Sequence, residues 1–112
     1  MRTTEPSSLP SHPAKRLSLL LSVHDHERHG SLAVHILQRA RRAGLAGATA
    51  FEGVEGFGGS GRVHRTHLLS DDAPVTIVIV DLPDRIDAFV RDAADLLDRV
   101  LVTVDEIDVV EL

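Results

Sequence analysis

Hydrophobic residues alternate with other residues along the first well-patterned stretch of the chain, from Leu17 to Val23. A period of two is typical of a β-strand, because successive side chains point to opposite faces of the sheet. Residues 48–52 have a weaker strand pattern, and residues 75–80 are β-branched throughout. A run that is apolar on both faces indicates a central strand that is covered on both sides. These stretches therefore predict three strands.

Two other stretches have the period of an amphipathic α-helix. The first follows Ser31, a candidate N-cap, and ends at Gly44 and Leu45, which have the pattern of a glycine C-cap and its hydrophobic follower. The second opens with Asp81 and Asp84, which resemble a capping box. The predicted apolar stripes are Ala33, Ile36, Leu37 and Ala40 in the first helix, and Ile86, Phe89, Val90, Ala93 and Leu97 in the second.

A last strand pattern covers residues 100–104 and 107–112, and its alternation breaks at Asp105 and Glu106. We therefore expect a bulge or a division into two short strands there. The order β-α-β-β-α-β predicts an α+β, ferredoxin-like fold, in which two helices cover one face of a four-stranded antiparallel sheet. The other face, which includes Leu20, is too apolar to face water, so we expect a homo-oligomer that covers it.

The chain of 112 residues is long enough for one small domain only. Residues 1–14 contain three prolines, three serines and two threonines, with almost no large apolar side chains. Such a composition cannot bury enough surface to offset the entropy lost on ordering. We therefore expect a flexible tail at residues 1–14 and one domain at residues 15–112. The basic pair Lys15-Arg16 and the short apolar run after it imitate a signal peptide, but a strand is the better interpretation.

Composition excludes several classes of function. The net charge of −5 and the absence of Trp and Tyr disfavour nucleic-acid binding, which needs a basic surface or stacking aromatic side chains. The absence of cysteine excludes disulfides, thiolate chemistry and Cys-ligated zinc, and it suits a cytoplasmic protein. No apolar run approaches the ~18 residues that a membrane-spanning helix needs.

The stretch from Gly53 to His67 is the strongest candidate for a functional site. Five of its first nine residues are glycine, and it continues through Arg62, His64 and Arg65. Glycine lets backbone N–H groups approach a ligand closely, and arginine binds phosphate or carboxylate in a bidentate manner. The stretch therefore predicts a cradle for an anion. The alternative is a long hairpin connection in which glycines only permit turns and Phe57 anchors the loop.

A second candidate is the histidine-rich segment His24–His29, which could bind a metal together with His64 or His67. Its His-Glu-Arg-His spacing is one residue short of the zinc-protease pattern, so a solvated loop is the simpler interpretation; the candidate metal ligands are His24, His26, His29, His64 and His67. His29 also precedes the start of the first helix, where the helix dipole favours an anion. No cysteine and no Gly-x-Ser-x-Gly motif supplies a nucleophile, so we do not expect an enzyme.

The order and spacing of several motifs resemble the PII-like proteins of domain of unknown function family 190, over about residues 15–112. The residues that carry the resemblance are Gly44-Leu45-Ala46-Gly47-Ala48-Thr49, Gly53-Val54-Glu55-Gly56-Phe57-Gly58, His64, Leu68-Leu69-Ser70 with Pro74, Val80-Asp81, Leu101-Val102-Thr103 and Val109-Val110. The resemblance implies a PII-like trimer with small-molecule sites between subunits and a mobile effector loop. By analogy with PII proteins, it implies an adenine nucleotide as the ligand. We expect the loop to signal ligand binding to a partner protein; the alternative is a protein-interaction module that binds no small ligand and whose partner recognises the loop itself.

The chain departs from that pattern at two places. The second glycine- and lysine-containing phosphate loop of PII proteins has no counterpart at Leu97–Val100, so the resemblance does not carry over a PII-type ATP site. Glu52 also occupies the position before the first loop glycine, where the family favours arginine, and an anion there weakens phosphate binding. The predicted ligand-binding residues are His29, Gly53, Gly56, Phe57, Gly58, Gly59, Arg62, His64 and Arg65.

Overall fold

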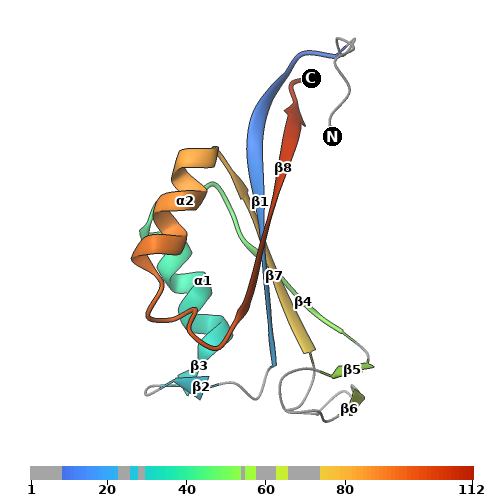
Figure 1. The fold of residues 1–112 in the computed structure, drawn as a ribbon, viewed down its shortest axis with the longest axis vertical. Helices are drawn as coiled ribbons and strands as arrows, with labels where there is room; N and C mark the ends of the chain where they lie inside the picture. Colours follow the sequence, from blue (N-terminus) through green and yellow to red (C-terminus); the bar gives the residue numbers. More distant parts are fainter. Residues whose placement is uncertain (1–8, 23–25, 28–29, 54, 58–62, 66–73) are drawn as a thin grey trace.

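The computed structural model of the chain describes residues 9–22, 26–27, 30–53, 55–57, 63–65 and 74–112. Figure 1 shows the elements in their order along the chain. They are β1 (Ser11–Ser22), β2 (His26–Glu27), β3 (Gly30–Ser31), α1 (Leu32–Arg42), β4 (Thr49–Glu52), β5 (Glu55–Phe57), β6 (Val63–Arg65), β7 (Pro74–Asp81), α2 (Pro83–Asp92) and β8 (Leu101–Val110).

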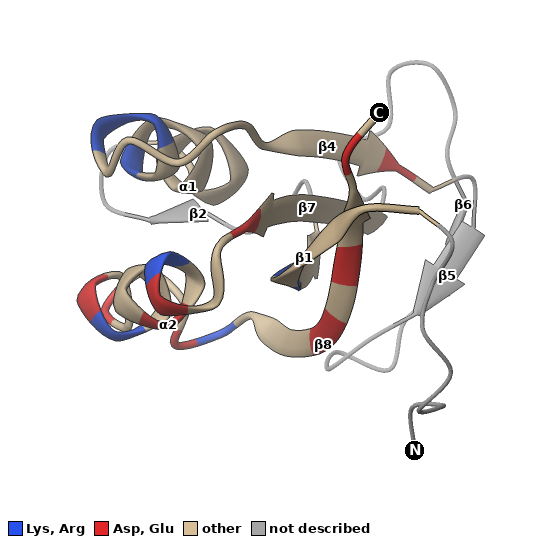
Figure 2. Ribbon diagram, turned by 90° about the horizontal axis from the view of Figure 1, so that it is seen from above, with Lys and Arg blue, Asp and Glu red and all other residues tan. Residues whose placement is uncertain are grey.

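The main sheet has four strands in the order β4-β7-β1-β8, and every neighbouring pair is antiparallel. Both helices lie on the same side of this sheet, α1 toward β4 and α2 toward β8 (Figure 2). The predicted ferredoxin-like α+β fold is therefore confirmed. Two short ribbons, β2–β3 and β5–β6, lie outside the main sheet.

The hydrophobic core lies between the sheet and the helices. Alternate residues of the two central strands are buried there, and they meet buried side chains of both helices. On the opposite face Val78 and Val80 are only half-buried, so in a single chain the run is covered on one side rather than on both. The most deeply buried large side chains are Leu17, Leu19, Ile36, Ile77, Ile79 and Ile86.

Both predicted caps of α1 are present. The Ser31 hydroxyl accepts a hydrogen bond from the backbone N–H of Val34, at 3.4 Å, and so satisfies a free donor of the first turn. Gly44 has a φ of +77°, and its N–H donates to the carbonyl oxygen of Arg41. The N–H of Leu45 donates to the carbonyl oxygen of Ala40. This pair of bonds is a Schellman motif, which needs glycine because other residues rarely adopt this φ.

The predicted capping box at the start of α2 is wrong. Pro83 fixes the first helical residue and holds Leu82, the N-cap, in an extended conformation. Asp81 precedes the cap, and its nearly buried carboxylate accepts hydrogen bonds from the N–H of Leu82 at 2.7 Å and of Ala46 at 2.9 Å. It also pairs with Arg85 Nε at 3.3 Å, and Arg85 donates to the carbonyl oxygen of Gly44. Asp81 therefore joins β7 and α2 to the turn between α1 and β4.

The predicted break in the last strand is also wrong. β8 keeps one register with β1 from Leu101, opposite Leu20, to Val110, opposite Ser11. The reason is that β1 is longer than predicted and supplies a partner across the whole of β8. Asp105 pairs with Arg16 on that partner, with 3.1 Å between carboxylate and guanidinium.

The longer β1 also changes the boundary of the predicted tail. The strand begins at Ser11, so residues 11–14 lie in the sheet, while residues 1–8 lie outside the described part of the chain. Pro13 is accommodated because β7 ends opposite Lys15, which leaves β1 with a single neighbour at this point. Edge positions of this kind tolerate proline.

Ion pairs connect the elements around the core. Lys15 Nζ lies 2.7 Å from Asp87 and joins β1 to α2. Arg39 of α1 donates to both carboxylate oxygens of Asp95 and to the carbonyl of Asp92. The hydrogen bond from Arg39 holds the pKa of Asp95 below its ordinary value. Among the described residues, no helix is long and apolar enough to cross a membrane.

Candidate functional site

The base of the glycine-rich loop is a clasp between the end of β4 and the start of β7. Glu52 is opposite Val75 in the sheet, and the next residue, Gly53, donates its N–H to the carbonyl oxygen of Pro74 at 2.7 Å. The chain therefore leaves and re-enters the sheet at adjacent points. Figure 1 places this base at the lower end of the sheet, next to β5 and β6.

Gly53 is required at this clasp by close packing. A Cβ atom added to Gly53 would lie 2.8 Å from Cγ of Pro74, closer than real Cβ contacts. The backbone of Gly53 does not have a positive φ, so its conformation alone would admit another residue. From the sequence, we interpreted the loop glycines as residues that let the backbone approach a ligand. In the structure, the backbone of Gly53 lies close to Pro74 instead.

We expect Gly53→Ala to lower the free energy of unfolding by about 1–3 kcal/mol, because the added methyl group must displace the Pro74 ring. Gly47→Ala is the matched control, because a Cβ there meets nothing within 4 Å and its φ is not positive. Urea denaturation of both variants measures the difference. Equal stability of the two variants would show that Pro74 moves without cost.

The strands β5 and β6 bring the two arms of the loop together. Gly56 is opposite His64, Glu55 is opposite Arg65, and Phe57 is opposite Val63. Residues on both arms of the predicted anion cradle are thus adjacent in backbone register. Of the other predicted ligand-binding residues, His29, Gly58, Gly59 and Arg62 lie outside the described part of the chain.

The start of α1 lies at the same end of the molecule as the loop base (Figure 1). The short ribbon β2–β3 leads into it, with His26 opposite Ser31 and Glu27 opposite Gly30. The first turn of α1 contains no acidic residue, so the positive end of the helix dipole is not neutralised there. The dipole of α1 therefore favours negative charge at this end of the molecule.

Three of the five predicted metal ligands lie outside the described residues, so their arrangement does not test the metal hypothesis. His24, His29 and His67 lie outside the described residues, whereas His26 is in β2 and His64 is in β6. Among the residues that the structure describes, no three histidine or acidic side chains are grouped to hold a metal ion. The histidine cluster therefore stays a prediction.

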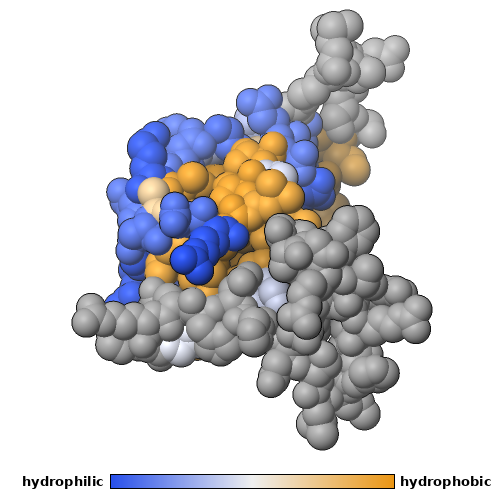
Figure 3. Space-filling view, turned by 60° about the horizontal axis from the view of Figure 1, so that its bottom comes forward, coloured by the Kyte–Doolittle hydropathy of each residue, from blue (hydrophilic) through white to orange (hydrophobic). Residues whose placement is uncertain are grey.

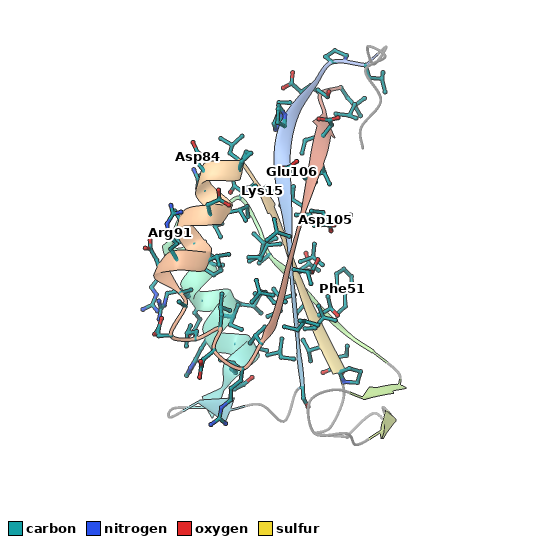
Figure 4. The ribbon with its side chains drawn as sticks, viewed as in Figure 1. Lys15, Phe51, Asp84, Arg91, Asp105 and Glu106 are labelled. Carbon is teal, nitrogen blue, oxygen red and sulfur yellow. The ribbon has the colours of Figure 1, made fainter. Side chains whose placement is uncertain are left out.

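The face of the sheet opposite the helices carries a row of apolar side chains. Cross-strand register aligns Phe51, Thr76, Leu20 and Leu101 on β4, β7, β1 and β8 in turn. Phe51, Leu20 and Leu101 are 56%, 41% and 62% exposed. Figure 3, in which the bottom of the molecule comes forward, shows hydrophobic surface in the middle of that view. Figure 4 shows Phe51 on the side of the sheet away from the helices. An exposed patch of this kind usually marks an interface.

The family described as Uncharacterized ACR, DUF190, matches residues 14–109. The chain belongs to this family. A relative named UPF0166 protein, from Aquifex aeolicus (strain VF5), is 29% identical over 80 residues, which cover 70% of this chain and 75% of the relative.

Solved structures of PII-like proteins have the same fold. CPII from Thiomonas intermedia K12, a nitrogen regulatory PII-like protein bound to ADP, AMP and bicarbonate, superposes with a TM-score of 0.71. The two share 20% identity over 93% of this chain and 94% of the other. A Thermus thermophilus protein described as PII-like and signalling has a TM-score of 0.60, with 14% identity over 89% and 91% of the two chains. CutA from Synechococcus elongatus PCC7942 also has a TM-score of 0.60, with 14% identity over 90% of this chain and 83% of its own.

Proposed function

We propose that this protein is a non-enzymatic, PII-like sensor that binds a small anion, an adenine nucleotide in the first instance, through the loop of residues 53–67. The observation that carries the proposal is the geometry of the loop base. The clasp between Gly53 and Pro74 and the pairing of β5 with β6 hold both arms of the loop at one end of a PII-like fold. The start of α1, with its anion-favouring dipole, lies at that same end.

In the proposed complex, the loop glycines let backbone N–H groups approach the ligand, and Arg62, His64 and Arg65 meet its negative charge. His29 would add a cationic or hydrogen-bonding group near the start of α1. Ligand binding orders the loop, and a partner protein recognises the ordered form. In this mechanism, the transition of the loop from a disordered to an ordered state signals that the ligand is bound.

The row of apolar residues on the open sheet face supports a homo-oligomer, and the resemblance to PII proteins implies a trimer. Leu20, Phe51 and Leu101 are large, exposed and aligned, so burial against other copies would remove them from water. Ligand sites would then lie between subunits, close to the loop bases. The composition, without cysteine, suits a cytoplasmic protein of this kind.

The choice of an adenine nucleotide has support from one neighbour in fold, because CPII of Thiomonas intermedia K12 is bound to ADP and AMP. The residues that would correspond to a second phosphate loop are Leu97–Val100, which lack glycine and lysine. Nucleotide phosphates would therefore depend on the loop of residues 53–67 for their positive charge.

A thermal-shift screen of tag-free protein tests this proposal, with AMP, ADP, ATP, bicarbonate and divalent metals as ligands and a chelator as control. A ligand at a hundred times its dissociation constant stabilises the folded state by about 2.7 kcal/mol. For a domain of this size the expected rise in melting temperature is about 10 °C. A shift with metal alone would favour the histidine cluster. No shift with any anion would overturn the sensor and leave a protein-interaction module.

A further inference from the structure

The last strand of the main sheet, β8, has one neighbour and one open edge. In the order β4-β7-β1-β8 it pairs with β1 alone, over ten positions from Leu101 to Val110. None of its residues is buried, whereas alternate residues of β1 and β7 are buried. Figure 1 shows that the second half of β8 extends past the helices. A strand edge of this length is a template on which another strand can pair.

The register with β1 determines which backbone groups of β8 point outward. The N–H of Glu111 donates to the carbonyl oxygen of Pro10, one position beyond the end of the register. Because hydrogen-bonded positions alternate along an antiparallel pair, the odd-numbered residues of β8 direct their N–H and C=O groups to β1. The even-numbered residues, such as Val104 and Glu106, direct these groups away from the sheet. β8 contains no proline, so every outward position has an N–H donor.

The other edges of the sheet are less suitable for strand pairing. The opposite edge strand, β4, is only four residues long. β7 ends opposite Lys15, so residues 11–14 of β1 have no described neighbour on that side. Pro13 is one of the odd-numbered residues of β1 that face this side, and it lacks an N–H. Short strands and proline are ways in which proteins prevent pairing at an edge, and charge is another. On β8 the protection is charge.

The charge on β8 is negative and determines which strand can pair with it. Asp105, Glu106 and Asp108 lie between apolar residues in the second half of the strand, and Figure 4 shows the first two. A second β8 in full overlap would bring carboxylates opposite carboxylates, which is unfavourable. A basic strand is complementary, and β1 is an example. It places Lys15 opposite Glu106 and Arg16 opposite Asp105, with 3.1 Å between guanidinium and carboxylate.

We propose that the outer edge of β8 is a docking site for an extended, basic segment of a partner protein. The segment adds one strand to the sheet, and its backbone hydrogen bonds with the outward-facing residues provide affinity. Lysine or arginine opposite the acidic residues determines its register, and apolar residues on either side cover the exposed Val104 and Val110. The loop of residues 53–67 follows β4, at the opposite edge of the sheet, so this site does not depend on the proposed anion sensor.

A fluorescein-labelled peptide of residues 14–22 tests the proposal, because it contains Lys15 and Arg16 of a strand that β8 already pairs with. Fluorescence anisotropy with the full chain measures its affinity. We expect binding, and a peptide with Lys15→Glu and Arg16→Glu should bind at least tenfold more weakly, because each cross-strand charge pair changes affinity by up to about fivefold. Failure of the basic peptide to bind overturns the inference, as would be found if another copy of the chain covers this edge.

A charge reversal in the protein locates the site. Glu106→Lys should weaken binding of the basic peptide by about tenfold and strengthen binding of the acidic peptide. Glu52→Lys is the matched control, because it makes the same charge change on an exposed glutamate of the opposite edge strand. Affinity for the basic peptide should change by less than about twofold in this control, because a distant exposed charge is screened. Equal losses in the two variants overturn the inference.

Two N-methylated peptides separate strand pairing from charge attraction and need only wild-type protein. Each has methyl groups on alternate backbone nitrogens, in opposite phase, and both keep the charges of the parent peptide. One phase removes the N–H groups that face β8 and should abolish binding, whereas the other phase leaves them and should keep it. Equal binding of both peptides would show that charge alone attracts the segment, and would overturn strand addition at β8.

Discussion

A Leu20→Glu variant is expected to be a monomer where wild-type protein is an oligomer. Leu20 is 41% exposed in the single chain and lies in the middle of the open face, between Thr76 and Leu101 in register. In the proposed trimer it would be buried, and an unpaired carboxylate there would cost about 4 kcal/mol or more per subunit. That cost raises the dissociation constant by about 1,000-fold. Light scattering coupled to size exclusion gives the mass directly.

Val34→Glu is the control for this experiment. Val34 is also large, apolar and half-exposed, at 48%, but it lies on α1 and so on the helix side of the sheet. The proposed interface does not include it, so this variant should keep the wild-type mass. A wild-type protein that is already monomeric, or a Leu20→Glu protein that stays oligomeric, would contradict the proposed use of the open face.

The second large effect is expected for the double variant Arg62→Ala/Arg65→Ala, which should lose anion binding almost completely. Each arginine is proposed to make a charge-assisted hydrogen bond, worth about 1.5–3 kcal/mol. Loss of both weakens binding by about 100-fold or more. Titration with the nucleotide that gives the largest thermal shift measures the loss, and the unfolding transition of the variant shows whether the fold is retained.

The matched control is Arg41→Ala/Arg42→Ala, which changes the net charge by the same amount. These arginines are exposed in the last turn of α1, at the end of the helix that lies away from the loop base (Figure 1), and neither forms an ion pair among the described residues. Affinity in this control should change by less than about threefold, because exposed charges at a distance are screened. Equal losses in the two double variants would mean that net charge, and not the loop arginines, attracts the ligand.

The sequence was a good guide to the fold wherever one local signal was decisive. The hydrophobic periods predicted the strands and helices, and Ser31 and Gly44 predicted both ends of α1, because caps depend on the chemistry of one or two residues. The sequence predicted the wrong structure where two local patterns favoured different structures. At α2 the acidic pair suggested a capping box, but Pro83 determines the helix start and leaves Asp81 for the turn at Ala46.

The errors at the two ends of the domain have a common cause. Pro10 and Pro13 suggested a tail, and the acidic pair at 105–106 suggested a break in the last strand. Both interpretations considered each segment alone. In the structure the two segments are partners, and β1 and β8 support each other in one continuous register. Pairing between residues so far apart in sequence cannot be read from local composition.

For the candidate site, the sequence predicted a ligand-binding loop but did not predict what holds the base of that loop. Glycine content and arginine and histidine side chains marked residues 53–67, and the structure pairs Gly56 with His64 across the two arms. Pro74 was not predicted to matter for the site, although it is the residue that Gly53 contacts. The feature of the sequence that could have indicated this contact is the proline at the first position of the next strand. His29, Arg62 and the other predicted residues outside the described part remain predictions.

The clasp between Gly53 and Pro74 has a consequence for how the loop can change. Because the two ends are already held together by the sheet, a longer loop adds only closure entropy, about 0.6 kcal/mol for each doubling of its length. Insertions between them should leave the sheet and the core intact. A circularly permuted fluorescent protein could therefore be inserted into the loop without unfolding the domain. If ligand binding orders the loop as proposed, its fluorescence would change on binding.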